Sequence, residues 1–403
     1  MVSIPKWVIL AYLNGNSELE PETAAAKSEI EKAAFGEDVE VLLQIGLLDE
    51  TTVKILRPDA MSCDMDDKWS GVRRYHICRS GSFLVGDMGN KNMADPNCLF
   101  DFIKWGMENY KAEHYILILG GHSCEYIGMM NDYSQDKPYI MGIPEISLVL
   151  ELVKHTAGRA IDLLIFDTCL FNNIELLYEL GQYGIPAVKT VLTYRGNAPA
   201  GGLFYSELLN AVNENCDESD LDIFIEKLVG ASQADLIAYR INPAGLENIK
   251  RQFSCLADAY LSDASSSRPD LPELLKSAAA DNPWRKIVDE IAYTVSSLVI
   301  CRKCASCRGT ETIRVLDRYI PFMSTAALYY RLAFARDNCW TKVLCSRLPE
   351  SSFRLAVTIG FTPMILPKSK IKALMISGSP VLSPSAAEGI LNGLIAYKKW
   401  VVL

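Results

Sequence analysis

Two stretches decide the fold of this 403-residue chain: Tyr115-Ile-Leu-Ile-Leu-Gly-Gly-His-Ser123 and Ile161-Asp-Leu-Leu-Ile-Phe-Asp-Thr-Cys-Leu170. Each is a nearly continuous apolar run of strand length that stops at glycine or polar residues. A helical pattern covers residues 144–154 between them. Strands that are apolar on both faces and alternate with helices form parallel sheets covered on both sides. The pattern therefore predicts an α/β fold with a mainly parallel central sheet.

A histidine and a cysteine, His122 and Cys169, directly follow these two strands. Ligand sites in such sheets lie at the carboxyl ends of the strands, and a right-handed crossover usually sets consecutive strands side by side. We therefore expect the two side chains to meet, although 47 positions separate them. A cysteine nucleophile needs a nearby imidazole, and the N-terminus of the helix expected over residues 172–180 would favour the thiolate of Cys169. The alternative is a buried structural cysteine and a surface histidine.

The same alternation of elements extends over most of the chain. Further strands are expected over residues 7–13, 39–45, 73–78, 82–86, 187–193, 353–359 and 371–376. Further helices are expected over residues 18–35, 96–110, 172–180, 203–213, 220–239, 243–261, 284–298, 325–336 and 384–398. An exposed loop is expected over residues 133–144, and a linker over the serine- and proline-containing residues 262–272.

The composition excludes several classes of protein. The 40 basic and 49 acidic residues give a net charge of −9, which does not favour binding to nucleic-acid phosphates. No apolar run reaches the roughly 20 residues of a membrane-spanning helix, and the first residues do not resemble a secretory signal. Without such a signal, the 12 cysteines are expected to be reduced. We therefore expect a cytoplasmic protein that binds neither nucleic acid nor a membrane.

Two other chemistries fit parts of the sequence less well. Residues 121–125 (Gly-His-Ser-Cys-Glu) are similar to the G-x-S-x-G nucleophile elbow, but Glu125 replaces the last glycine, and no histidine follows His155. Zinc could bind cysteine and histidine pairs or a cysteine triplet with a fourth ligand. The residues concerned are His76 with Cys78, His122 with Cys124, and Cys301, Cys304 and Cys307 with Cys339 or Cys345. Free thiols are the simpler interpretation of the triplet, and no motif supports calcium.

Taken in order, several segments resemble the clostripain-like cysteine peptidases, relatives of caspases, gingipains and legumain. The second quoted stretch is similar to the family's nucleophile strand, usually written aspartate–alanine–cysteine–leucine, and the first to its histidine strand. Residues 7–20 and 92–105 resemble the opening strand and the helix before the histidine strand. Residues 318–322 and 329–334 resemble its final strand and following helix. The resemblance implies a caspase-like α/β/α sandwich with helical insertions and a C-terminal subdomain.

The resemblance also implies roles for individual residues. Cys169 would attack the scissile carbonyl, and His122 would protonate the leaving amine as general acid. Main-chain amides at Cys169 and just after His122 would hold the oxyanion. Asp167, beside Thr168, matches a position that lines the pocket for a basic residue on the amino-terminal side of the cut, the P1 residue. The expected activity is a cysteine endopeptidase that uses no cofactor and acts on protein or peptide substrates.

Three positions differ from the family pattern. Gly121 and Ser123 stand where the family usually has an acid and a glycine, although serine keeps its amide. Arg195 brings positive charge where acidic residues would help to hold a basic P1 side chain. An altered P1 preference, or a catalytically inactive protein-binding module, is therefore the alternative to a peptidase that cuts after Arg or Lys.

Three units are expected: a caspase-like core over residues 1–250, a helical insertion that completes it over 251–345, and a C-terminal extension over 346–403. Relatives are often zymogens that cut themselves between histidine and cysteine. Basic candidates for such a cut are Lys137, which precedes a proline, Lys154 and Arg159. A regulated or self-processing zymogen, with a regulatory protein partner, is thus a further expectation.

Overall fold

The computed structural model describes residues 4–33, 35–60, 69–124, 128–136, 138–262, 283–303, 332–336, 338–339 and 362–364. Within these residues, every helix is too short or too polar to span a lipid bilayer. Several expected elements lie outside the described residues: the linker after residue 262, strands 353–359 and 371–376, and helix 384–398.

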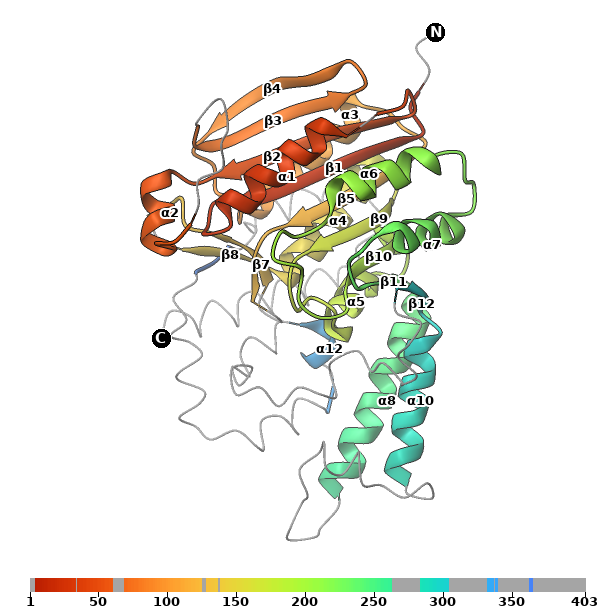
Figure 1. Cartoon of the computed structure of the whole chain (residues 1–403). Coiled ribbons are helices and arrows are strands. Elements are labelled where there is room, and N and C mark those ends of the chain that lie inside the picture. The colour runs from red at the N-terminus through yellow and green to blue at the C-terminus, as the bar shows by residue number, and fades with distance from the viewer. Residues whose placement is uncertain are drawn as a thin grey trace.

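A nine-stranded sheet forms the centre of the molecule (Figure 1). Its strand order is β12-β11-β10-β9-β5-β1-β2-β3-β4. The five inner strands are parallel, and two antiparallel strands extend the sheet at each edge. The inner strands are β1 (Trp7–Gly15), β2 (Val39–Leu47), β5 (His114–Gly120), β9 (Ile161–Asp167) and β10 (Val188–Tyr194). The edge strands are β3 (Gly71–Cys78), β4 (Gly81–Gly89), β11 (Leu236–Arg240) and β12 (Val299–Arg302).

Helices cover both faces of this sheet, as expected for strands that are apolar on both sides (Figure 1). One face packs against α1 (Glu20–Lys32), α6 (Tyr205–Glu214) and α7 (Leu221–Ala231). The other packs against α3 (Pro96–Asn109), α4 (Ile143–Ala157) and α5 (Ile174–Gly181), with α8 (Pro243–Ser262) and α10 (Pro283–Ser296) beyond. The short helices α2 (Glu50–Leu56) and α12 (Ala333–Arg336) complete the described set. The expected α/β/α sandwich with a mainly parallel sheet is confirmed.

Two segments differ from the sequence-based expectation. The helix expected over residues 220–239 ends at Ala231, and residues 236–240 form β11, because a short run that is buried on both sides carries no periodicity. The loop expected over residues 133–144 contains β8 (Tyr139–Gly142), whose Ile140 and Met141 are fully buried. That strand belongs to a second sheet with the order β13-β8-β7-β6, formed by β13 (Thr362–Met364), β7 (Gly128–Asp132) and β6 (Ser123–Cys124). The expected boundary between the first two units, at residue 250, falls inside α8, and the division into three units stays a prediction.

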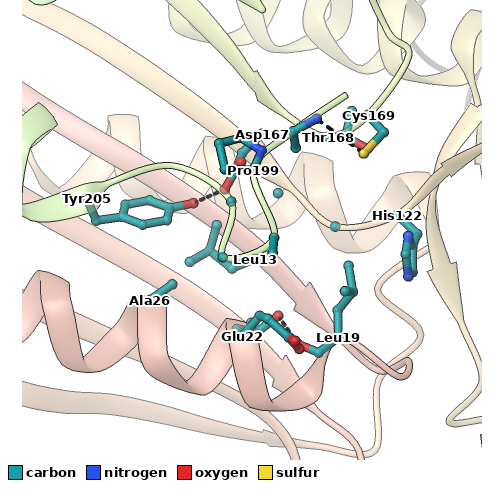
Figure 2. Close-up of a pocket in the computed structure, with 17 residues that line it drawn as sticks. Leu13, Leu19, Glu22, Ala26, His122, Asp167, Thr168, Cys169, Pro199 and Tyr205 are labelled. Carbon is teal, nitrogen blue, oxygen red and sulfur yellow. Dashed lines mark hydrogen bonds between the residues drawn. The ribbon is translucent and has the colours of Figure 1, made fainter. Parts of the chain in front are cut away.

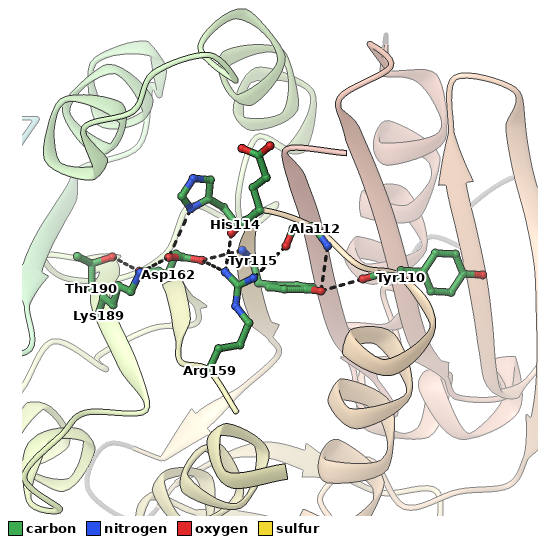
Figure 3. A network of polar contacts seen from close by, with 9 residues as sticks. Tyr110, Ala112, His114, Tyr115, Arg159, Asp162, Lys189 and Thr190 are labelled. Carbon is green, nitrogen blue, oxygen red and sulfur yellow. Dashed lines mark hydrogen bonds and ion pairs between the residues drawn. The ribbon is translucent and has the colours of Figure 1, made fainter. Parts of the chain in front are cut away.

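A buried carboxylate ties the amino ends of three central strands together (Figure 3). Asp162, near the start of β9, is fully buried. Its carboxylate accepts a bond of 2.9 Å from the Tyr115 amide of β5 and one of 2.6 Å from Lys189 Nζ of β10. Arg159 Nη2 and His114 Nδ1 lie 3.4 and 3.5 Å from it. This cluster aligns β5, β9 and β10 at the end of the sheet opposite the strand ends discussed below.

Replacing Asp162 by alanine is expected to lower the free energy of unfolding by about 2–4 kcal/mol, because the Tyr115 amide loses its acceptor and two cations lose their partner. Asp162→Asn, which keeps an acceptor, is expected to cost less. The exposed Asp235→Asn is the control, with a change within about 0.5 kcal/mol. Urea unfolding followed by circular dichroism measures all three. A loss below 0.5 kcal/mol for Asp162→Ala would show that the cluster does not hold the strands.

Candidate active site

The carboxyl ends of β5 and β9 lie side by side. The two strands are parallel neighbours, and their register pairs Gly120 with Asp167. His122 and Cys169 therefore each stand two residues beyond a paired position. The main chain is also joined past the strand ends, where the Gly121 amide donates to the Asp167 carbonyl at 3.2 Å. The adjacency expected from the crossover is thus present in the fold.

Glycine is required at position 121. Its φ of +147° lies in the region that L-residues rarely adopt, and a Cβ there would come within 3.2 Å of the Asn14 carbonyl oxygen. The chain can thus turn tightly off β5 and pass close to the end of β1. His122 follows this turn, and its carbonyl accepts a bond of 2.9 Å from the Met130 amide of β7.

Cys169 lies in an irregular turn after β9. Its Sγ accepts a bond of 3.3 Å from the Ala198 amide, and its carbonyl accepts a bond from the Ser123 hydroxyl. The next residue, Leu170, has a φ of +57°, and its amide donates to the Gly196 carbonyl at 3.1 Å. The helix expected over residues 172–180 is α5, which begins at Ile174, five residues after Cys169. The amide that bonds the thiol is that of Ala198, in the loop after β10.

The imidazole of His122 faces a carboxylate. His122 Nε2 lies 3.1 Å from Glu18 Oε1, and the two side chains are 32% and 33% exposed. Glu18 belongs to the loop that joins β1 to α1. The contact with His122 holds the pKa of the Glu18 carboxyl below its ordinary value, against the effect of partial burial.

His122 and Cys169 line the same pocket, which encloses about 220 Å³ (Figure 2). Strand ends, the start of α1 and the loop before α6 form its walls. Among the described residues, the acids that line it are Asp167 and Glu22, and no lysine or arginine does so. The lining residues are Leu13, Leu19, Glu22, Thr23, Ala26, Gly120, Gly121, His122, Asp167, Thr168, Cys169, Ala198, Pro199, Ala200, Gly201, Gly202 and Tyr205.

Asp167 is fixed in the pocket by three donors. Its Oδ1 accepts bonds of 2.6 Å from the Tyr194 hydroxyl and 3.0 Å from the Leu203 amide, and its Oδ2 accepts one of 2.8 Å from the Tyr205 hydroxyl. Gly202, with a φ of +76°, passes so close that a Cβ there would lie 3.0 Å from Oδ2. Burial raises the pKa of Asp167, and the three donors oppose that rise.

The other predicted site residues fall into two groups. Gly121 and Thr168 line the pocket, and the buried Thr168 hydroxyl has no hydrogen-bond partner among the described residues. Ser123 and Arg195 are not among the lining residues. The Ser123 hydroxyl binds the Cys169 carbonyl, and Arg195 Nη1 lies 3.4 Å from Asp235 Oδ1. Arg195 thus pairs with Asp235 outside the described lining, and its effect on the P1 residue stays a prediction.

The alternative chemistries find no support in the described part of the chain. His76 pairs with Glu40 at 3.0 Å, and the Cys78 thiol lies 3.0 Å from the Ser80 hydroxyl. Among the described residues, no group of three or more metal-binding side chains is close enough to hold an ion. Cys304, Cys307 and Cys345 lie outside those residues. The stretch after His122 continues into β6 and β7, whereas a nucleophile elbow needs a helix at that point.

Sequence reasoning missed three residues of this site: Glu18, Tyr194 and Tyr205. Glu18 lies in the segment 7–20 that resembles the family's opening strand, but nothing in that segment indicates a contact with His122. The tyrosines lie 27 and 38 positions from Asp167, so only the folded sheet brings them to the carboxylate.

Comparisons with known proteins agree with this architecture. Residues 77–282, just over half of the chain, match the clostripain family, peptidase C11. Clostripain of Hathewaya histolytica is 31% identical over 99 residues, which cover 22% of this chain and 18% of clostripain. The aligned part thus spans less than a fifth of that relative's length.

Solved structures of the same family share the fold. A secreted C11 cysteine protease from Bacteroides thetaiotaomicron, in complex with an irreversible peptide inhibitor, is 13% identical with a TM-score of 0.52. The alignment covers 74% of this chain and 84% of that one. An inactive zymogen of a C11 protease from Parabacteroides distasonis is 12% identical with a TM-score of 0.50, over 75% and 84% of the two chains. With the sheet order and the pocket at the strand ends, the family match leads to one conclusion: this chain belongs to the clostripain family.

Proposed function

We propose that the protein is a cysteine endopeptidase in which Cys169 is the nucleophile and His122 the general acid. The observation that carries this proposal is that both side chains line one pocket, at the ends of neighbouring parallel strands. Cys169 Sγ would attack the scissile carbonyl and form a thioester as the C–N bond breaks. His122 would give its proton to the departing amine, and water would then hydrolyse the thioester.

Main-chain amides supply the oxyanion site in this proposal. The bond from the Met130 amide to the His122 carbonyl flanks the pair Ser123–Met129, which makes that pair a non-hydrogen-bonded position of the ladder. The Ser123 amide is thus outside the ladder and can donate to a developing oxyanion, together with the Cys169 amide. The Ser123 hydroxyl, bound to the Cys169 carbonyl, supports this arrangement by joining the two segments.

We further propose that the P1 side chain is basic. The pocket has two carboxylates, Asp167 and Glu22, and no cation among its lining residues. Asp167 Oδ1 already accepts two bonds, whereas Oδ2 accepts one, so Oδ2 retains the capacity for one further donor. Because Arg195 pairs with Asp235, it does not oppose a cation here. That pairing also removes one of the observations that favoured a catalytically inactive binding module.

Self-processing in the segment between His122 and Cys169 completes the proposal. Lys154 is an unsuitable site, because it lies in α4 and its Nζ bonds Glu151 and the Ile185 carbonyl. Arg159 is held by the carbonyls of Ala112 and Glu113. Peptidases cut exposed, extended chain, which neither residue offers. Lys137 lies outside the described residues.

The remaining parts of the expected function are also proposals. The reaction as written uses no metal or cofactor, and calcium is assigned no role. Protein or peptide substrates follow from peptidase chemistry. The cytoplasmic location, a regulatory partner and the absence of membrane or nucleic-acid binding rest on the sequence.

Replacing Cys169 by alanine is expected to lower kcat/KM for a lysyl- or arginyl-amide peptide by about 10⁴-fold or more, because the thioester cannot form. His122→Ala is expected to cost about 10²–10⁴-fold through loss of the proton donor. The control is Cys255→Ser, which removes an exposed thiol on α8 and leaves activity unchanged. A fluorogenic assay measures the three variants. Full activity in Cys169→Ala would contradict the proposal.

Replacing Asp167 by asparagine is expected to lower kcat/KM for a peptide with P1 lysine or arginine by about 10–100-fold, the value of a hydrogen bond between charged groups. A peptide with the uncharged P1 norleucine serves as control and should change little. The ratio of the two kcat/KM values is measured in wild type and variant. An unchanged ratio would exclude Asp167 as the P1 carboxylate.

Purified wild-type protein is expected to show two fragments on a denaturing gel, cut between His122 and Cys169, whereas the Cys169→Ala variant stays intact. The thiol is needed for the cut, and intact mass spectrometry locates it. If the same fragments form in both proteins, another peptidase produces them and self-processing is excluded.

A further inference from the structure

We propose that Glu18 is a positioning residue for His122: it holds Nε2 of the ring and thereby leaves Nδ1 as the nitrogen that protonates the leaving amine. The inference rests on the proposed peptidase function and adds a third residue to the His122/Cys169 pair. The contact that carries it is the 3.1 Å separation of His122 Nε2 from Glu18 Oε1.

The burial of the two ring nitrogens distinguishes them. The side chain of His122 is 32% exposed, yet its Nε2 is buried, and the Glu18 contact at 3.1 Å is an ion-pair separation rather than an aligned hydrogen bond. The nitrogen available to the pocket is therefore Nδ1. A neutral imidazole that carries its proton on Nε2 has a lone pair at Nδ1, and the imidazolium donates from both nitrogens. The imidazolium is the form that can give a proton to an amine.

A network of buried polar side chains fixes the loop that carries Glu18. Asn14 and Asn16 are both fully buried. The Asn14 side chain accepts from the Asn16 amide at 3.0 Å and donates to the Asn131 carbonyl at 3.0 Å. Asn16 Nδ2 donates to the buried Asp132 carboxylate at 2.8 Å. The loop after β1 is thus joined to β7 through hydrogen bonds that fix its conformation.

The same strand also holds His122. The Met130 amide of β7 donates to the His122 carbonyl, and the Tyr133 amide just beyond β7 donates to the Asn16 carbonyl at 2.8 Å. The loop that carries Glu18 and the main chain of His122 are therefore both hydrogen-bonded to β7. These bonds place the carboxylate against the ring independently of their charges.

The charged surroundings of this pair are few in the described part of the chain. Arg57 Nη1 pairs with Glu22 Oε1 at 2.9 Å and contacts only the main-chain carbonyl of Glu18, at 3.3 Å. The other acid among the pocket-lining residues, Asp167, is bound by Tyr194 and Tyr205. Glu18 is thus the carboxylate in direct contact with the imidazole.

The Glu18→Gln variant tests the inference. It keeps the shape of the side chain and removes the charge, so kcat/KM for a lysyl-amide peptide is expected to fall on the order of 10–100-fold, part of the contribution of general acid catalysis. The loss is expected in kcat, with KM within about twofold of wild type, because Glu18 is not among the residues that line the pocket. The matched control is Glu20→Gln at the start of α1, which removes an equal charge and should move neither quantity.

A second variant separates positioning from a purely structural role. Glu18→Asp keeps the charge on a shorter side chain and is expected to recover part of the kcat that Glu18→Gln loses, with KM unchanged. If Glu18→Gln does not fold, Glu18→Asp decides: a reduced kcat with unchanged KM supports the inference, and wild-type kcat overturns it. Equal losses of kcat in both variants, or wild-type kcat in Glu18→Gln, also overturn it. Activity retained in Cys169→Ala would instead mean that the proposed function fails.

Discussion

The pairing of β5 with β9 is the constraint on which the rest of the site depends. Both strands are apolar on two faces, so each must lie inside the sheet, and the crossover through α4 makes them neighbours. Their register sets Gly120 opposite Asp167, and the two proposed catalytic residues, His122 and Cys169, each follow two positions later. At the other end of the strands, the Asp162 cluster holds the same neighbours in line. A change in register by one residue would turn the side chains of a strand to the opposite faces of the sheet.

The electrostatics of the pocket follow from what each charged group already binds. Asp167 is buried but satisfied by two hydroxyl groups and one amide, so its oxygen atoms have a fixed orientation before any substrate arrives. Arg195, which would oppose a cationic substrate, pairs with Asp235. A fixed carboxylate in a pocket whose described lining contains no lysine or arginine is suited to a cationic side chain, because its donors need no rearrangement during binding. At His122, the Glu18 carboxylate is likewise held in place before a substrate binds, because buried amide groups fix its loop.

The sequence predicted the parts of this structure that local pattern determines. Continuous apolar runs gave β5 and β9 to within one residue, and their order placed His122 and Cys169 at one edge. Strand β11 was assigned to a helix, because four buried residues after a helical pattern carry no period of their own. The turn at Cys169 depends on Leu170 at positive φ and on a carbonyl 26 positions away, which no local pattern encodes. The charge of Arg195 was visible, but its partner, 40 residues away, was not.

The most direct measurement is to locate the adduct of an irreversible peptidyl ketone inhibitor that ends in lysine. The protein has 12 cysteines, and seven of those in the described residues are free thiols, so the choice of thiol is informative. Mass spectrometry of the digested protein is expected to find one equivalent of inhibitor, on Cys169, and a slower reaction when His122 is replaced by alanine. An adduct on other cysteines in similar yield, or no adduct on Cys169, would contradict the account of a thiol and an imidazole acting in one strand-end pocket.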